Sequence, residues 1–265
     1  MKSYPTYGQS FVLLLIMFFC CVISVLIIMP FYSVESGIGI SLIYPLSMIL
    51  TIAIALFLRG QYAFPMKSFP MGLILVASVT VMSLHLFIDP ITNLVPPSDT
   101  LKRIFKETIQ HPISFFAMIV IAAPVLEELL FRGVVLDGLL KNYDPRKAIS
   151  FSALLFAIVH GNLAQGIGAF MIGLFIGWIY WKTGSVVPGI LIHFTNNLVS
   201  YLIIISTKEE ELFTSFSELV ANPLFYWLLI VVGGLISATG IWLLHKKYFK
   251  EKAISLNLEN EIRSV

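Results

Sequence analysis

Apolar residues in this chain are gathered in runs of about 20, the length at which a helix crosses a bilayer. Inside hydrocarbon every backbone N–H and C=O group must be satisfied by the protein, and a helix does this within one segment. The sequence therefore predicts an all-α, polytopic membrane helix bundle of about eight transmembrane helices, with residues 1–265 as a single membrane domain. The candidate spans are 10–30, 38–58, 70–89, 112–140, 147–161, 163–182, 185–205 and 223–245. The fifth is short and the sixth follows it almost at once, so these two could form a tight helical hairpin.

The amount of charge agrees with this interpretation. Charged residues make up 12% of the chain and hydrophobic residues 58%, whereas a soluble domain has about 25% charged residues. So little charge cannot cover a water-facing surface, and membrane lipid is the expected surrounding. A net charge of +2 is too small to indicate a nucleic-acid partner.

The positions of lysine and arginine predict an orientation. If the N-terminus is cytoplasmic, eight spans place twelve of the seventeen basic residues inside and four outside, with Arg132 within a span. This bias fits the positive-inside rule and predicts a multi-pass protein with both termini in the cytoplasm, in the cell membrane if the source is prokaryotic. The inside set is Lys2, Arg59, Lys67, Lys141, Arg146, Lys147, Lys182, Lys246, Lys247, Lys250, Lys252 and Arg263; the outside set is Lys102, Arg103, Lys106 and Lys208.

One loop has helical periodicity of its own. Within residues 98–110, apolar side chains fall on one face of a helix and basic side chains on the other. This pattern predicts an amphipathic helix at the outer membrane interface.

Three ionisable residues lie close together in the fourth span. A charged side chain at the centre of a bilayer costs about 2.5–3.5 kcal/mol on insertion scales, so each one calls for a reason. Glu128 and Arg132 are four residues apart and share a helix face, which allows an ion pair. Glu127 points about 100° away around the helix and is free to act on something else. The same residues could also form an ion pair that only orients the bundle.

Two further spans carry histidines. His160 ends the fifth span, and the seventh contains His193 and Asn197, four residues apart. At 1.5 Å per residue from the cytoplasmic helix ends, these side chains come to a similar depth, roughly 13–21 Å, as Glu127, Glu128 and Arg132. One shared site within the membrane is therefore expected.

The residue types suit hydrolysis by activated water. A carboxylate and a histidine can orient and deprotonate water, while a second histidine and an asparagine amide can donate to an oxyanion. No serine or cysteine has the surroundings of a nucleophile. Glu127, His160 and His193 would equally make a zinc set with an open position, so a divalent metal such as Zn²⁺ is an open alternative.

Three motifs carry a resemblance to a known family. EELLFR, FAIVH and HFTNN match EExxxR, FxxxH and HxxxN in that order. With these motifs the chain resembles the CAAX-protease and bacteriocin-processing (CPBP, or Abi) family of intramembrane peptidases, over a peptidase core at residues 112–203. The resemblance implies about eight spans with the active site inside the bilayer, and both glutamate-dependent and metalloprotease members.

The resemblance also implies a role for each residue. Glu127 would activate water together with His160, Glu128 and Arg132 would support them, and His193 and Asn197 would form the oxyanion hole. The expected activity is an intramembrane endopeptidase acting on a membrane-associated or lipidated protein or peptide. The alternatives are a transporter or proton-relay protein, and a non-catalytic bacteriocin-immunity or regulatory membrane protein.

Overall fold

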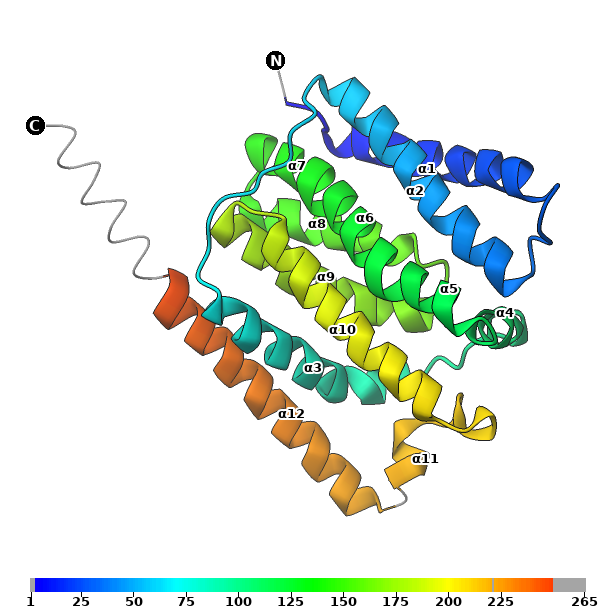
Figure 1. The fold of residues 1–265 in the computed structure, drawn as a ribbon. Helices are drawn as coiled ribbons and strands as arrows, with labels where there is room; N and C mark the ends of the chain where they lie inside the picture. The colour runs from blue at the N-terminus through cyan, green and yellow to red at the C-terminus, as the bar shows by residue number, and fades with distance from the viewer. Residues whose placement is uncertain (1–2, 221, 250–265) are drawn as a thin grey trace, which may run out of the picture.

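The computed structural model describes residues 3–220 and 222–249, and within them the chain is a bundle of helices (Figure 1). The predicted all-α membrane bundle is confirmed. Most of its long helices run side by side along one axis (Figure 1). The elements are α1 (Tyr7–Ile28), α2 (Gly37–Arg59), α3 (Gly72–Thr92), α4 (Asp99–Ile109), α5 (Pro112–Phe116), η1 (Ala117–Ala122), α6 (Ala123–Leu130), η2 (Phe131–Leu136), α7 (Asp137–Asn142), α8 (Pro145–Ile158), α9 (Leu163–Thr183), α10 (Val187–Ser206), η3 (Glu209–Glu211), α11 (Phe216–Val220), α12 (Pro223–Leu243) and η4 (Leu244–Phe249).

Polar residues and glycines set where the long helices begin and end. Thr6 and Gln9 form a reciprocal capping box at the start of α1, and the Ser36 side chain caps α2. Helices α2 and α9 each end at a glycine with positive φ, Gly60 at 69° and Gly184 at 64°, a left-handed conformation that other residues rarely adopt.

Seven stretches of the described chain are long and apolar enough to cross a membrane. The fifth predicted span is the exception: α8 has 14 residues, which corresponds to about 21 Å and falls short of the roughly 30 Å hydrocarbon core. It still reverses the chain, because it turns at Gly161 and packs against α9. A Cβ on Gly173 would lie 3.1 Å from Ala153 Cβ, so a small residue on α9 permits this close approach.

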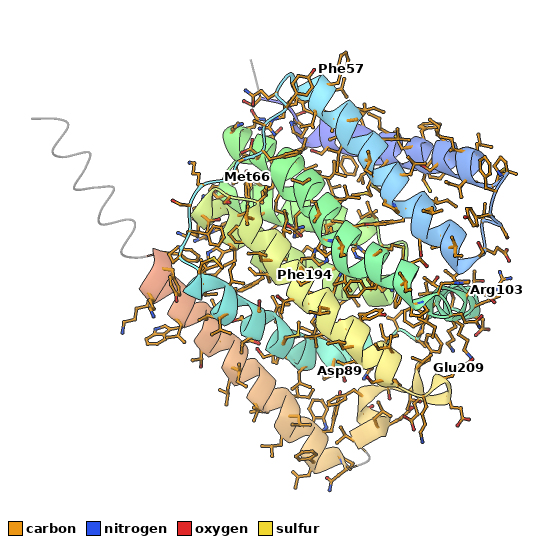
Figure 2. All side chains as sticks on the ribbon, in the orientation of Figure 1. Phe57, Met66, Asp89, Arg103, Phe194 and Glu209 are labelled. Atoms are coloured by element: carbon orange, nitrogen blue, oxygen red, sulfur yellow. The ribbon has the colours of Figure 1, made fainter. Side chains whose placement is uncertain are left out.

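The connections between helices gather at two ends of the bundle. At one end, called here the Asn142 end, the Ser3 N–H donates to Asn142 Oδ1 over 2.9 Å, and Met66 pairs with Ser185. At the opposite, Arg103 end, Arg103 pairs with Glu35 at 3.1 Å. Figure 2 shows Met66 and Phe57 toward one end and Arg103 and Glu209 toward the other.

Both ends of the described chain lie at the Asn142 end. Ser3 bonds to Asn142 there, and Tyr248 packs against Gly72 at the start of α3. Most described basic residues of the predicted inside set also lie there, in the segments that end or begin α2, α3, α7, α8, α9 and α12. The others, Lys2, Lys250, Lys252 and Arg263, lie outside the described residues.

The amphipathic helix predicted within residues 98–110 forms as α4. It is seen end-on in Figure 1, whereas its neighbours run across the view, so it lies across the Arg103 end of the bundle. Its Phe105 ring packs edge-on against Phe115, with 5.9 Å between ring centroids. The apolar face of α4 is thus partly covered by the protein itself.

The predicted orientation can be tested by thiol labelling. In a protein with Cys20 and Cys21 replaced by serine, Arg146→Cys is expected to react with an impermeant reagent only from the cytoplasmic side, and Glu210→Cys only from the other side. Both positions are exposed, one at each end, and the positive-inside rule places the Asn142 end in the cytoplasm. The reverse labelling pattern would overturn the predicted orientation.

Candidate active site

Two π-helical turns interrupt the helical stretch Pro112–Asn142 on either side of α6. In the first, the Ala123 N–H donates to Met118 O, five residues back. The next residue in that pattern, Pro124, has no N–H to offer Ile119 O. Asn197 Nδ2 from α10 donates to that carbonyl instead, at 2.8 Å.

The second π turn is held from α2. Here the Asp137 N–H donates to Arg132 O, again five residues back. Arg59 donates to Gly133 O and to Asp137 Oδ2, both at 2.7 Å. Side chains from α10 and α2 thus hold the two turns that flank Glu127 and Glu128, and π turns are frequent at functional sites.

Glu128 and Arg132 form the predicted ion pair, with 2.9 Å between Arg132 Nη1 and Glu128 Oε1. Both side chains are fully buried, at 0% and 1% exposure. Arg132 also donates to Gly173 O at 3.2 Å, and its guanidinium lies 4.7 Å from the centre of the Phe156 ring. Since a buried charge is tolerated only when paired and hydrogen-bonded, these contacts explain how α6 carries an arginine inside the bundle.

Glu127 points to a different face, as the helix geometry predicts, and its two oxygens have different surroundings. Oε1 accepts a hydrogen bond from the hydroxyl of Tyr44 on α2. Oε2 is buried and, among the described residues, has no hydrogen-bond partner. It lies 3.9 Å from Nε2 of His193. One oxygen is therefore anchored while the other is left as a bare acceptor.

The histidines are each oriented through Nδ1. His160 Nδ1 lies 2.7 Å from Phe156 O, and His193 Nδ1 lies 3.1 Å from Glu128 Oε1. The Phe156 carbonyl oxygen can only accept a hydrogen bond, and so can the Glu128 carboxylate when it is ionised. Each histidine Nδ1 therefore carries the proton. The Nε2 atoms are then the groups left to meet a substrate or water.

A chain of polar side chains connects α3 to α10. His85 Nε2 lies 2.8 Å from Asn196 Oδ1, and Asn196 Nδ2 donates to Asn197 Oδ1 at 3.1 Å. Asn197 in turn donates to Ile119 O. These bonds fix the orientation of the Asn197 amide, whose second N–H has no bonded partner among the described residues.

A cavity of about 490 Å³ joins these groups. This catalytic cavity is lined by Glu127, His160, His193 and Asn197, together with Tyr44, His85 and Asn196. Glu128 and Arg132 lie directly behind its wall. Since one water occupies about 30 Å³, the cavity has room for a water and part of a substrate. The six residues predicted from three separate spans are thus brought into one site.

Sequence reasoning missed three members of this site. Tyr44 and His85 lie on α2 and α3, in spans that contain few polar residues, and Asn196 is the neighbour of a predicted residue. His85 could have been found by the argument applied to His160, because any histidine within a span is costly. Nothing marks Tyr44 in the sequence, since a lone tyrosine is common in membrane helices.

The predicted metal set does not come together as a binding site in this structure. Zinc needs at least three protein ligands around one point, at about 2.0–2.3 Å. Within residues 3–220 and 222–249, no three His, Cys, Asp or Glu side chains are grouped closely enough to hold a metal ion. Glu127 Oε1 is instead occupied by Tyr44. A metal bound by Glu127, His160 and His193 stays a prediction, which elemental analysis of the purified protein tests.

Comparison with known proteins agrees with the motifs. Residues 109–199 match the family model "type II CAAX prenyl endopeptidase Rce1-like", and this segment contains all six predicted site residues. No curated protein and no solved structure matches the chain. The predicted resemblance is confirmed: residues 109–199 are similar to the Rce1-like family of type II CAAX prenyl endopeptidases, a family of proteases.

Proposed function

We propose that this protein is an intramembrane endopeptidase that hydrolyses a peptide bond of a membrane-associated or lipidated protein or peptide. The observation that carries the proposal is the buried Glu127 Oε2, which has no bonded partner among the described residues; Glu127 lines a cavity that three histidines also line. A carboxylate oxygen in this setting needs a donor, and a water bound there would meet a base.

The attack step follows from the arrangement of the bases. Water held by Glu127 Oε2 attacks the carbonyl carbon of the scissile bond and gives up a proton to Glu127 or to His160 Nε2. With Nδ1 protonated toward Phe156 O, neutral His160 presents a lone pair at Nε2. The same proton is later delivered to the leaving nitrogen, so that the C–N bond breaks as an amine departs.

The oxyanion is stabilised from α10 in this proposal. The second N–H of Asn197 would donate to the developing negative charge, and so would His193 Nε2 when it carries a proton. Glu128 contributes by fixing the His193 ring through Nδ1.

Reconstitution tests the proposal. The purified protein is placed in lipid vesicles with candidate membrane peptides, and products are identified by mass spectrometry. The expected result is cleavage by the wild type and none by His160→Ala. Uptake of a solute driven by an ion gradient, without cleavage, would support a transporter instead. A catalytically inactive variant that retains bound substrate would identify the natural one, including any role in bacteriocin processing or immunity.

Tyr44→Phe is expected to lower kcat about tenfold with little change in KM, because the carboxylate loses the donor that orients it for attack. Steady-state kinetics of peptide cleavage measures the two constants separately. Tyr32→Phe removes the same hydroxyl from an exposed tyrosine and should leave both constants unchanged. An unaltered kcat in Tyr44→Phe would mean that the hydrogen bond to Glu127 has no part in the reaction.

A further inference from the structure

A second cavity, of about 780 Å³, lies at the Arg103 end of the bundle. We call it the vestibule. Its walls come from the end of α3 and the connection after it, from α4, from the start of α9, from the end of α10 and from the segment from Leu212 to Glu218. Thr92 and Gln165 line both the vestibule and the catalytic cavity. The two cavities therefore meet at these side chains.

The junction is polar and reaches solvent. Gln165 is exposed, and its Oε1 accepts a 2.7 Å hydrogen bond from Asn162, the residue that caps the start of α9. Thr92 bonds to the carbonyl of Asp89 in the last turn of α3. Ser200 and His160 line the catalytic cavity together with Glu127. Polar side chains are therefore present both at the junction and in the cavity that holds the proposed base.

The membrane-facing side offers a different kind of surface. A groove of about 660 Å³ between α3, α8 and α9 is lined almost entirely by apolar side chains such as Phe87, Ile158 and Phe170. Among the described residues, it shares no lining residue with the catalytic cavity. This lipid groove suits hydrocarbon, and it borders the vestibule at Asn162 rather than the catalytic cavity.

The walls of the vestibule suit a polypeptide instead. Aromatic and aliphatic side chains, such as Phe105 and Phe213, alternate there with hydroxyl and amide groups, such as Ser215 and Asn93. An extended peptide presents the same mixture, because its side chains project between backbone N–H and C=O groups that need partners.

We propose that an extended polypeptide segment of the substrate reaches the catalytic cavity through the vestibule, from the Arg103 end of the bundle, past Thr92 and Gln165. This inference rests on the proposed peptidase function. Because the Arg103 end carries the smaller share of basic residues, the predicted orientation places this entrance on the non-cytoplasmic side.

The route can be tested without catalysis. In nanodiscs, where both ends meet water, Ser200→Cys is introduced into a protein with Cys20 and Cys21 replaced by serine. The rate at which a small hydrophilic reagent modifies this thiol reports access to the catalytic cavity. Gln165→Trp narrows the junction and is expected to slow the reaction at least about tenfold, whereas Leu163→Trp should change it by less than about twofold.

Leu163→Trp is a matched control because Leu163 lies two residues away on α9, is exposed and lines the lipid groove rather than the vestibule. Equal labelling rates in the two variants, or slowing by Leu163→Trp alone, would overturn the route. In the cleavage assay, Gln165→Trp should lower kcat/KM at least about tenfold, chiefly by raising KM.

The two proposals can fail separately. If the wild type cleaves no peptide, the labelling rates still show whether the cavity opens through the vestibule. If cleavage is observed but Gln165→Trp slows neither labelling nor cleavage, the peptidase stands and the route is wrong.

Discussion

Glu127→Gln is expected to lower kcat/KM for peptide cleavage by about 10²–10⁴-fold, the range that general-base catalysis supplies. The amide keeps the size of the side chain and can still accept from Tyr44. It removes the basic oxygen, Oε2, which is buried without a bonded partner among the described residues. The measurement is product formation in vesicles under conditions in which substrate is below KM.

Thermal unfolding separates this effect from a folding defect. Glu127→Gln replaces a buried carboxylate by a neutral group, so the variant should unfold at the same or a higher temperature than the wild type. Glu35→Gln makes the same chemical change at an exposed carboxylate and should leave activity and stability unaltered. Cleavage by Glu127→Gln at the wild-type rate would remove Glu127 from the mechanism.

Arg132→Met is expected to destabilise the protein by about 3–5 kcal/mol, because it leaves the Glu128 carboxylate buried without its charge partner. Glu128 is 0% exposed, and Oε2, its second oxygen, already lacks a bonded partner among the described residues. The contact between the guanidinium and the Phe156 ring is lost as well. Unfolding of the detergent-solubilised variant, followed by heating or denaturant, measures the loss.

The double variant Glu128→Gln with Arg132→Met provides the control. Removing both charges leaves no unpaired ion, so the double variant should recover most of the stability lost in Arg132→Met. It should remain poorly active, because His193 loses the carboxylate that orients its Nδ1. If Arg132→Met is as stable as the wild type, the ion pair has no structural role.

Glu128 therefore links stability to chemistry in this site. One of its oxygens, Oε1, meets both Arg132 and His193, at 2.9 Å and 3.1 Å. Glu127, one residue earlier, contacts Tyr44 on a different helix. Adjacent carboxylates can take such different parts because consecutive helical side chains diverge by about 100°.

Hydropathy was sufficient to predict the membrane bundle, because a bilayer requires long apolar helices whatever their arrangement. It was less reliable where a helix is short. The apolar stretch 147–161 was counted as a short span that could form a hairpin with its neighbour; the helix ends at Ile158 and the chain does turn at Gly161. The end of α8 depends on local capping and on its packing against α9. An average of hydropathy over a window of residues is insensitive to both.

The π turns were not foreseen either. Pro124 removes one N–H from the helix, but which carbonyl is released depends on the hydrogen-bond register on either side of it. That register is held by Asn197 and Arg59, which are distant in the chain from the turns they contact.

The sequence alone was enough to identify the six polar residues of the central spans as a candidate site, because ionisable groups in a membrane are rare and costly. Their motif spacing could also be recognised from the sequence. Only the tertiary structure decided that Glu127 has one anchored and one bare oxygen. The anchor is Tyr44, from a helix outside the matched segment. It also decided that the cavity meets the vestibule at Thr92 and Gln165. Contacts of this kind join residues far apart in the chain, and no periodicity within one helix specifies which neighbour it will meet.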